Sequence, residues 1–441
     1  MALSLSKNSY ICSKFQEMLR IADIKENLEK VVRGLEKKRV KNASQQIELL
    51  IELDDNRRNT QIDLDSTLNE LNNISKEIGA LMKAGEKEGA EKAKIQTVEL
   101  KSKSRDMQEQ LKSAEEQLTQ ALYNLPNSAH ELVPDGNSVD DNKVILEKGV
   151  MPELSSDAQP HWDLIEKYDI IDFNLGNKIT GAGFPVYKGK GAKLQRALIN
   201  FFLDEAAKEG FVEIQPPVLI NSDSGHGTGQ LPDKEGQMYG IVDSDLFLIP
   251  TAEIPLTNIY RDVILQEDDL PVRNVGYSPC FRREAGSWGA HVRGLNRLHQ
   301  FDKVEIVQIT RPEDSYEALD RMCTYVQSLL EKLELPFRKL LLCGGDLGFT
   351  SAMTYDMEVY SAAQKMWLEV SSVSNFEAYQ ANRLKLRYKK DGKKTTLLHT
   401  LNASALALPR IVAAILENNQ DENGITIPKV LQSYTGFNRI S

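Results

Sequence analysis

The first part of the chain has apolar residues at helical spacing and lacks residues that break helices. No proline occurs before Pro126. One apolar series comprises Leu64, Leu68, Leu71, Ile74, Ile78 and Leu81, and a second comprises Ile95, Val98, Met107, Leu111, Ala114, Leu118, Ala121 and Leu125. Steps of three and four residues are typical of amphipathic helices. Two glycines in the charged stretch 83–89 predict a turn, so we expect an antiparallel coiled-coil hairpin.

Beyond residue 125 the pattern mixes strands with helices. Strand-like runs occur at 246–249, 274–281, 298–310 and 366–374, and helical runs at 193–209, 312–333 and 410–418. The strands neighbour one another like hairpins and do not alternate regularly with helices, which favours an α+β fold on a mostly antiparallel sheet. We therefore expect a disordered extension at 1–17, a helical domain at 18–125, a linker and entry segment at 126–180, and a second domain at 181–441.

Composition narrows the class of protein. Charged residues make up 27% and hydrophobic residues 41% of the 441 positions, and the net charge is -10. These values are ordinary for a soluble globular protein and argue against a wholly basic nucleic-acid binder. No segment approaches the roughly 18 apolar residues of a membrane helix. The extension at 1–17 shows no secretory signal, although a transit peptide is an alternative.

The four cysteines, at positions 12, 280, 323 and 343, form no C-x-x-C pair. We therefore expect neither a disulfide framework nor a cysteine-based zinc site. Unpaired cysteines suit a reducing compartment, and a cytoplasmic location is the expectation.

The densest candidate chemistry surrounds residues 280–305. Arg282 and Glu284 are two residues apart, so a strand would present both on one face. Arg297, Phe301 and Glu305 are four apart and would share one face of the returning strand. An arginine, a carboxylate and an aromatic ring on neighbouring strands can hold a phosphate, an amine and a purine. Spacing alone leaves open a surface ladder of charges on a hairpin.

This segment resembles motif 2 of class II aminoacyl-tRNA synthetases, in the form found in seryl-tRNA synthetases. Further segments agree in order: residues 210–217 (GFVEIQPP) resemble motif 1, 227–232 and 251–253 the serine-specific loops, 367–372 the last strand, and 399–410 motif 3. The hairpin resembles the family's tRNA-binding arm. The resemblance runs from about Met18 to the end of the chain. It implies a class II catalytic domain with motif 1 at about 193–219, motif 2 at about 274–305 and motif 3 at about 399–418.

The resemblance also implies a role for individual residues. ATP would be bound by Arg282, Arg283, Glu284, Arg297, Leu298, Phe301, Glu369, Val370, Ser371, Ser372 and Arg410, of which Arg282, Glu369 and Arg410 would be catalytic. Serine would be bound by Thr251, Ala252, Glu253, Arg282, Glu305, Asn402 and Ser404, and Mg²⁺ by Glu369 and Ser372. No zinc is expected. Motif 3 departs from the family pattern because alanines stand at 403, 405 and 407, where glycines are usual, and Pro409 precedes Arg410.

The implied activity is a serine–tRNA ligase that forms seryl-adenylate from L-serine and ATP and transfers serine to tRNA(Ser), and also to tRNA(Sec). The implied assembly is a homodimer, with no membrane partner. On the arm, Lys92, Lys94, Lys101, Lys103 and Arg105 could contact tRNA phosphates without reading sequence. Alternatives for the arm are a solvated coiled coil or an oligomerisation device. Alternatives for the whole chain are a catalytically dead RNA-binding homologue and a ligase that charges a carrier protein.

Overall fold

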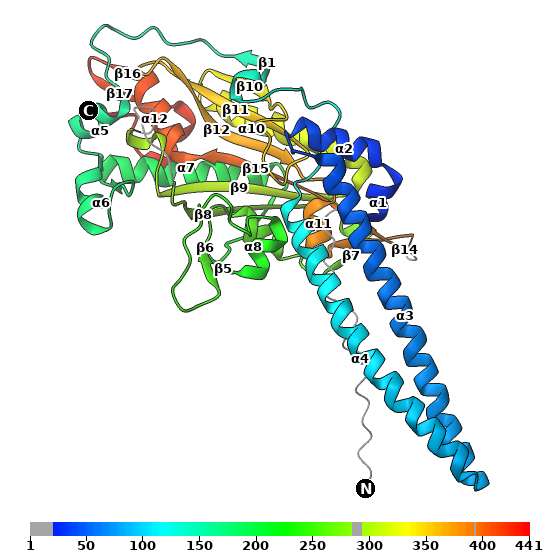
Figure 1. Cartoon of the computed structure of the whole chain (residues 1–441). Helices are drawn as coiled ribbons and strands as arrows, with labels where there is room; N and C mark the ends of the chain where they lie inside the picture. The colour runs from blue at the N-terminus through cyan, green and yellow to red at the C-terminus, as the bar shows by residue number, and fades with distance from the viewer. Residues whose placement is uncertain (1–20, 285–292, 392–393) are drawn as a thin grey trace. The chain divides into compact units, whose positions relative to one another are not determined.

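The computed structural model describes residues 21–284, 293–391 and 394–441. The chain forms two compact units, one made of residues up to 32 with 40–126, and one made of 33–39 with 127–441. Figure 1 shows the helical hairpin of the first unit and the large sheet of the second. The predicted extension at 1–17 lies outside the described residues. Within the described ranges, no helix combines the length and the apolar character required to span a bilayer.

The first unit is helical. Its elements are α1 (Ile21–Glu26), the start of α2 (Leu28–Lys37), α3 (Ala43–Ala84) and α4 (Lys87–Asn124). At about 1.5 Å per residue, the 42 residues of α3 span about 63 Å. Gly85 ends α3 with a left-handed φ of 80° and donates its N–H to the carbonyls of Leu81 and Met82, as glycine commonly does at helix ends. The predicted hairpin is confirmed, with a tighter turn than expected because Gly89 lies inside α4.

The seam between α3 and α4 differs in one detail from the prediction. Ile95 and Val98 are 57% and 68% exposed, so they do not belong to the seam. The buried residues of α4 instead include Ala90, Ala93, Leu100, Ser104, Leu111, Ala114, Leu118 and Leu122. From Ala93 these positions follow steps of three, four or seven residues, which is the coiled-coil repeat. Small side chains at 93 and 104 allow close helix approach, and a search for large apolar residues overlooks them.

The second unit is built on an eight-stranded sheet in the order β1-β10-β11-β12-β15-β9-β8-β4. Its strands are β1 (Lys143–Lys148), β10 (Phe337–Leu341), β11 (Met353–Ser361), β12 (Met366–Asn375), β15 (His399–Ala407), β9 (Gln300–Thr310), β8 (Val272–Phe281) and β4 (Val212–Glu213). All neighbouring pairs are antiparallel except β4 with β8. The α+β expectation is therefore confirmed.

Helices and small sheets complete the second unit. The helices are α5 (His161–Lys167), α6 (Phe173–Ile179), α7 (Gly189–Lys208), α8 (Ser222–Thr228), α9 (Glu253–Asn258), α10 (Ser315–Lys332), α11 (Tyr379–Arg383), α12 (Leu408–Asn418) and α13 (Gln432–Thr435). The smaller sheets join β2 (Ile171–Asp172) with β3 (Val186–Tyr187), β5 (Leu219–Asn221) with β6 (Leu246–Leu248), β7 (Ile264–Gln266) with β13 (Arg387–Lys390) and β14 (Lys394–Leu397), and β16 (Gln420–Asp421) with β17 (Gly424–Thr426) and β18 (Arg439–Ile440).

The main hydrophobic core packs the sheet against α7, α10 and α12. Val304 and Ile306 of β9 are fully buried in this core. Because side chains alternate along a strand, Lys303 and Glu305 point to the opposite face of the sheet. Figure 1 shows β9, β15, β12 and β11 side by side. On that opposite face Val307 and Ile309 pack into a second hydrophobic cluster, and the stretch around Lys303 and Glu305 is left for a polar site.

Candidate active site

The end of β8 places the two residues that dominate the predicted site. β8 ends at Phe281, so neither Arg282 nor Glu284 lies in a strand, and the predicted shared strand face is wrong. Arg282 still donates its N–H to the carbonyl of His299, the next position in the β8–β9 register, whereas Arg283 turns away from β9 and donates to the Gln237 carbonyl, both at 2.9 Å. Glu284 then adopts a left-handed φ of 49°, which is uncommon for a residue with a Cβ and frequent at functional sites.

Arg297 also lies outside the strands. It follows the short 3₁₀ helix η4 (Gly294–Asn296) and precedes β9, which begins at Gln300. The predicted common strand face of Arg297, Phe301 and Glu305 is therefore wrong for the arginine. Its guanidinium nevertheless returns to Glu284, with Nε on the carboxylate.

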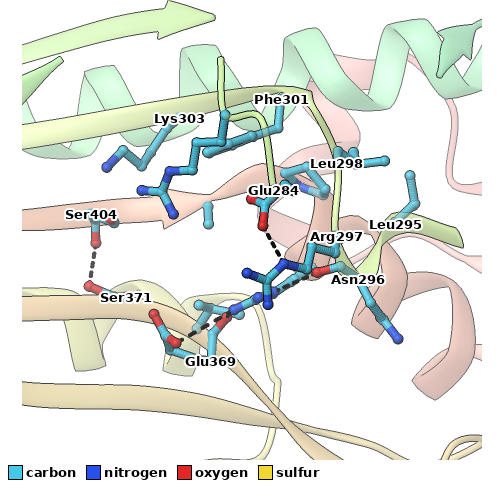
Figure 2. A pocket seen from close by; sticks show the side chains of 15 residues that line it. Glu284, Leu295, Asn296, Arg297, Leu298, Phe301, Lys303, Glu369, Ser371 and Ser404 are labelled. Atoms are coloured by element: carbon cyan, nitrogen blue, oxygen red, sulfur yellow. Dashed lines mark hydrogen bonds and ion pairs between the residues drawn. The ribbon is translucent and has the colours of Figure 1, made fainter. Parts of the chain in front are cut away.

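A cavity of about 230 Å³ gathers most of the predicted ATP ligands. It is lined by Arg282, Glu284, Leu295, Asn296, Arg297, Leu298, Phe301, Lys303, Glu369, Val370, Ser371, Ser404, Ala407, Pro409 and Arg410. The Arg282 guanidinium lies 5.3 Å from the centroid of the Phe301 ring. Figure 2 shows these side chains converging from β9, β12 and the segment around η4. Since the residues line a cavity, a surface charge ladder does not describe them.

Two arginines in this cavity are paired with carboxylates. Arg297 pairs with Glu284, and Figure 2 shows the two side chains facing each other. Arg410 Nη1 donates to the Glu369 carbonyl at 2.6 Å and lies 3.7 Å from its carboxylate. Arg410 Nε donates to the Asn296 carbonyl at 3.1 Å. Both arginines are therefore held in place by acidic and carbonyl oxygens of the same cavity.

A second cavity of about 490 Å³ is lined by the predicted serine ligands except Ala252, and it shares Arg282, Glu284, Arg297, Lys303, Glu369 and Ser404 with the first. Its lining includes Thr251, Glu253, Glu305, Ser372 and Asn402. Ser404 lies directly opposite Glu305 across β15 and β9, and its hydroxyl is 3.3 Å from that carboxylate. The shared residues join the two cavities into one continuous site.

Lys303 is a central residue of this site that sequence reasoning missed. Its Nζ lies 2.7 Å from Glu305 Oε2 and donates to Thr251 Oγ1 at 2.7 Å. The side chain is almost fully buried, and a buried charge needs such partners. The strand period could have found it, because Phe301, Lys303 and Glu305 alternate along β9 and a step of two would have included the lysine.

Glu253 is the most strongly perturbed acid in the serine region. Burial and the neighbouring charge of Glu305 raise the pKa of Glu253 to about 7. Gln380 Nε2 donates to Glu253 Oε1 at 2.7 Å, and a hydrogen bond with Asn402 also favours the ionised form. Gln380 lies in the short helix α11, and no sequence signal marks it. Carboxyls with pKa values near neutrality commonly mark functional sites.

Two of the predicted ligands do not line the cavities, one because it is buried and the other, Arg283, although it is exposed. Ala252 is fully buried at the start of α9, and Arg283 is held through its backbone; neither lines the two cavities. In motif 3, Ala403 and Ala405 are buried in β15, so their methyl groups pack into the core. Pro409 lies in the first turn of α12, where a missing N–H costs nothing, and Arg410 follows in the cavity.

The residues predicted to hold magnesium present hard oxygen ligands. Ser372 Oγ donates to Glu369 Oε1 at 3.2 Å. Asp356 lies opposite Ser372 across β11 and β12, and burial together with the charge of Glu369 raises the pKa of Asp356 well above its usual range. In the described part of the chain, no group of three acidic, histidine or cysteine side chains could hold a metal ion. A carboxylate and a hydroxyl suit Mg²⁺ that keeps its phosphate and water ligands.

The five predicted tRNA contacts all lie on α4 in the first unit. Lys92, Lys94, Lys101, Lys103 and Arg105 are all exposed. Three of them lie near acids of the same helix: Lys92 is 3.4 Å from Glu88, Lys94 is 3.0 Å from Glu91, and Arg105 is 3.7 Å from Glu109. Exposed pairs of this kind are worth less than about 1 kcal/mol. The cations are therefore readily available to another anion.

Comparisons with known proteins agree over most of the chain. Residues 18–129 match the seryl-tRNA synthetase N-terminal domain, and residues 241–419 match the tRNA synthetase class II core domain (G, H, P, S and T). A serine–tRNA ligase of Salinibacter ruber is 50% identical over 89% of this chain and 92% of its own length. That of Prosthecochloris aestuarii is 44% identical over 96% of this chain and 99% of its own.

A solved structure extends the agreement to three dimensions. The seryl-tRNA synthetase of Pyrococcus horikoshii, crystallised in complex with ATP, superposes with a TM-score of 0.89 at 34% identity and covers 96% of this chain and 99% of its own. The hairpin, the antiparallel sheet and the two joined cavities thus occur in a chain whose relatives share one reaction. The chain belongs to the seryl-tRNA synthetase family of class II aminoacyl-tRNA synthetases.

Proposed function

We propose that the two joined cavities bind ATP and L-serine side by side, form seryl-adenylate, and deliver the serine to tRNA(Ser). The observation that carries this proposal is the position of Arg282, which lines both cavities. A guanidinium at that junction can contact the α-phosphate of ATP and the carboxylate of serine together, because its planar fork suits two anionic oxygens. The P. horikoshii relative binds ATP, which supports ATP as the nucleotide here.

The first step needs no protein base. A carboxylate oxygen of serine bonds to the α-phosphorus of ATP, and the bond from that phosphorus to the bridging oxygen breaks, which releases pyrophosphate. The barrier comes from repulsion between anions and from misorientation, so catalysis consists of charge neutralisation and positioning. Arg297 and Arg410 neutralise the γ-phosphate, Phe301 stacks on adenine, and Glu284 accepts a hydrogen bond from the adenine amino group.

Serine is selected by polar groups. Its ammonium fits between carboxylates, and Glu253 and Glu305 lie together in the second cavity. Asn402, Ser404 and Thr251 offer hydrogen bonds to the amine and the hydroxyl. A site built to bond a hydroxyl rejects an analogue that lacks it, since its own buried groups would stay unpaired. Alanine should therefore be a poor substrate although it fits by size.

Glu369 and Ser372 are the residues that would hold Mg²⁺ with the α- and β-phosphates. When bound there, Mg²⁺ supplies positive charge to the phosphates. Arg410, which contacts Glu369, keeps that carboxylate oriented towards the cavity.

The second step uses the helical arm. The 3′-terminal hydroxyl of tRNA attacks the carbonyl carbon of seryl-adenylate, loses its proton, and displaces AMP. The cations of α4 bind tRNA phosphates during this step. tRNA(Sec) as a further substrate, a homodimer assembled through residues 193–219, and a cytoplasmic location stay predictions.

Pyrophosphate exchange tests the proposal most directly. Purified protein is incubated with ATP, labelled pyrophosphate and each of the twenty amino acids in turn, without tRNA. Exchange with serine alone is the expected result. Arg282→Ala should reduce exchange by about a thousandfold and Arg282→Lys by less. Arg321→Ala, at an exposed cation on α10, is the matched control and should leave exchange unchanged. Undiminished exchange in Arg282→Ala would remove that residue from the mechanism.

A further inference from the structure

A buried histidine–carboxylate pair lies behind the ATP cavity and belongs to no ligand set described above. His161, at the start of α5, and Glu417, near the end of α12, are both fully buried. His161 Nδ1 is 2.7 Å from Glu417 Oε1, and the His161 backbone N–H donates to the same oxygen at 2.9 Å. Ser361 Oγ donates to the other carboxylate oxygen.

The hydrogen bonds determine the protonation state of the histidine. The backbone N–H of Leu295, which can only donate, points at His161 Nε2 at 2.8 Å. Nε2 therefore carries a lone pair, and the single ring proton is on Nδ1, where it is donated to Glu417. Burial opposes ionisation of Glu417, but the hydrogen bonds from His161 and Ser361 outweigh it and hold the pKa of that carboxyl below its ordinary value. The pair is thus a neutral imidazole oriented by a carboxylate.

The same carboxylate reaches the ATP cavity by a second route. Gln364 Nε2 donates to Glu417 Oε1 at 2.9 Å, and Gln364 Oε1 accepts from Asn296 Nδ2 at 2.8 Å. Asn296 lines the cavity, and its carbonyl accepts from Arg410 Nε at 3.1 Å. Arg410 and Glu417 lie at opposite ends of α12. The hydrogen bonds from Glu417 through Gln364 and Asn296 to Arg410 therefore form a closed ring with this helix, which we call the circuit. η4 is held at the two residues that precede Arg297: Leu295 through its bond to His161, and Asn296 through its bonds to Gln364 and Arg410.

The glycine before Leu295 belongs to the same arrangement. Gly294 has a φ of 65°, and a Cβ at this position would lie 2.3 Å from His161 Nε2. The backbone of η4 therefore packs directly against the imidazole, and a side chain at this position would separate them. The imidazole thus contacts the backbone of η4 through Nε2 and the Glu417 carboxylate of α12 through Nδ1.

We propose that His161 and Glu417 are positioning residues that fix η4 against α12. They thereby set the distance between Arg297 and Arg410, the two arginines assigned to the γ-phosphate. Burying a carboxylate and an imidazole in place of apolar side chains costs free energy of folding. Here both groups hold the backbone N–H of Leu295, two residues before Arg297. The proposal rests on the assignment of Arg297 and Arg410 to the γ-phosphate. It predicts an effect on ATP that AMP, which lacks that phosphate, does not share.

Two substitutions of the histidine separate its two hydrogen bonds. His161→Gln places an amide oxygen near the position of Nε2, so it retains an acceptor for Leu295. His161→Asn places its amide near Nδ1, so it retains a donor to Glu417 but leaves the Leu295 N–H without an acceptor. The dissociation constants of ATP and AMP, each with Mg²⁺, are measured by calorimetry on the full-length chain, together with the KM for ATP and for serine in pyrophosphate exchange.

The expected result is a selective loss in one variant. His161→Asn should weaken ATP binding by about tenfold and leave AMP binding and the KM for serine within about twofold, whereas His161→Gln should stay within about threefold for every ligand. Gln364→Met, which keeps the shape of the side chain and removes both its hydrogen bonds, should weaken ATP binding by about fivefold and spare AMP.

A structural role alone gives a different pattern. It lowers the thermal midpoint and the active fraction in both histidine variants, while the affinities of the folded molecules stay unchanged. That pattern overturns the proposal, as does equal weakening of ATP and AMP. If His161→Asn does not fold, Gln364→Met decides by the same ratio of ATP to AMP affinity. Failure of the wild-type chain to exchange pyrophosphate with serine would instead contradict the proposed function, and the ratio would still report on the circuit.

Discussion

The helical hairpin and the eight-stranded sheet use burial in different ways. In the hairpin, the buried residues form a single line along each helix, and the line includes Asp54, Thr67 and Ser104 beside its leucines. In the sheet, eight consecutive residues of β9, from Lys303 to Thr310, are all buried. Lys303 and Glu305 lie within this run and also belong to the site.

This difference indicates which parts of the molecule tolerate substitutions and which do not. A one-line seam loses only local contacts when one residue changes, and the exposed faces of α3 and α4 carry charges that need no fixed geometry. In the sheet, residues of the core and of the site alternate along the same strands, so a shift in packing also displaces a ligand. We therefore expect large effects on serine activation from the sheet and effects limited to tRNA from the hairpin.

Shortening the arm should give the largest effect. Thr67 Oγ1 lies 3.6 Å from Met107 Sδ across the seam, so residues 68–106 can be replaced by a four-residue glycine-rich turn that keeps the remaining seam in register. Aminoacylation of tRNA, measured as kcat/KM, should fall by about a thousandfold because the α4 cations are removed. Serine-dependent pyrophosphate exchange should stay within about threefold. A parallel loss of both activities would contradict the separation.

Removing only the charges should give a smaller effect on the same step. With Lys92, Lys94, Lys101, Lys103 and Arg105 all changed to Gln, we expect the KM for tRNA to rise by about thirtyfold at low salt, since each phosphate contact adds to the salt dependence of binding. The slope of log affinity against log salt should become shallower. Lys76→Gln with Lys112→Gln, at exposed positions outside the cluster, is the control and should change the KM by less than about twofold. An equal rise in the control would show that the contacts are not confined to the cluster.

The acidity of Glu253 predicts a pH effect confined to the sheet unit. Its pKa is raised to about 7, so the carboxyl loses its proton as pH rises through neutrality, and only the ionised form attracts the serine ammonium. The KM for serine should therefore fall by about tenfold between about pH 6 and pH 8, while the KM for ATP changes little. In Glu253→Gln the KM for serine should be higher and flat over that range. A wild-type KM for serine that does not change with pH would contradict the role of this carboxylate.

The seam assignment predicts the smallest effect. Ile95→Ala and Val98→Ala together should change the free energy of unfolding by less than about 0.5 kcal/mol, because both side chains are largely exposed. Leu111→Ala, at a buried seam position, is the matched comparison and should cost about 2 kcal/mol. Urea denaturation followed by circular dichroism measures both. An equal loss in the free energy of unfolding would show that Ile95 and Val98 belong to the seam.

Sequence pattern predicted the elements better than it predicted how they end. The four predicted strands are all present, with boundaries within two residues, because long runs of β-branched and aromatic residues have few other uses. The departure of the backbone from β8 had no local signal, since it is marked by Arg283, which bonds to the distant Gln237. Side-chain periodicity therefore continued the strand too far.

The site residues also fall into those that the sequence could predict and those that it could not. Arg282, Glu284, Arg297 and Arg410 could be named from motifs, and all four line one cavity. Gln380 could not be found, because it reaches Glu253 from a short helix 127 positions along the chain. Lys303 could have been found from alternation on β9. In the seam of the arm, Ala93 and Ser104 escaped notice because a hydrophobicity count gives small residues no weight, although their size lets the helices approach.

The internal ion pairs of the ATP cavity have a consequence for which molecules can enter it. Arg297 is already neutralised by Glu284, and Arg410 lies beside Glu369. A free phosphate ion would have to displace a carboxylate from an arginine and would leave that carboxylate without a partner. Under the proposed function, a nucleotide that arrives with Mg²⁺ would replace every partner at once: its phosphates would pair with the arginines, its adenine amino group with Glu284, and Glu369 would help to hold the metal. On the same proposal, the carboxylates would compete for the arginines again as pyrophosphate departs, so the pairs that exclude small anions would also hasten the release of the product.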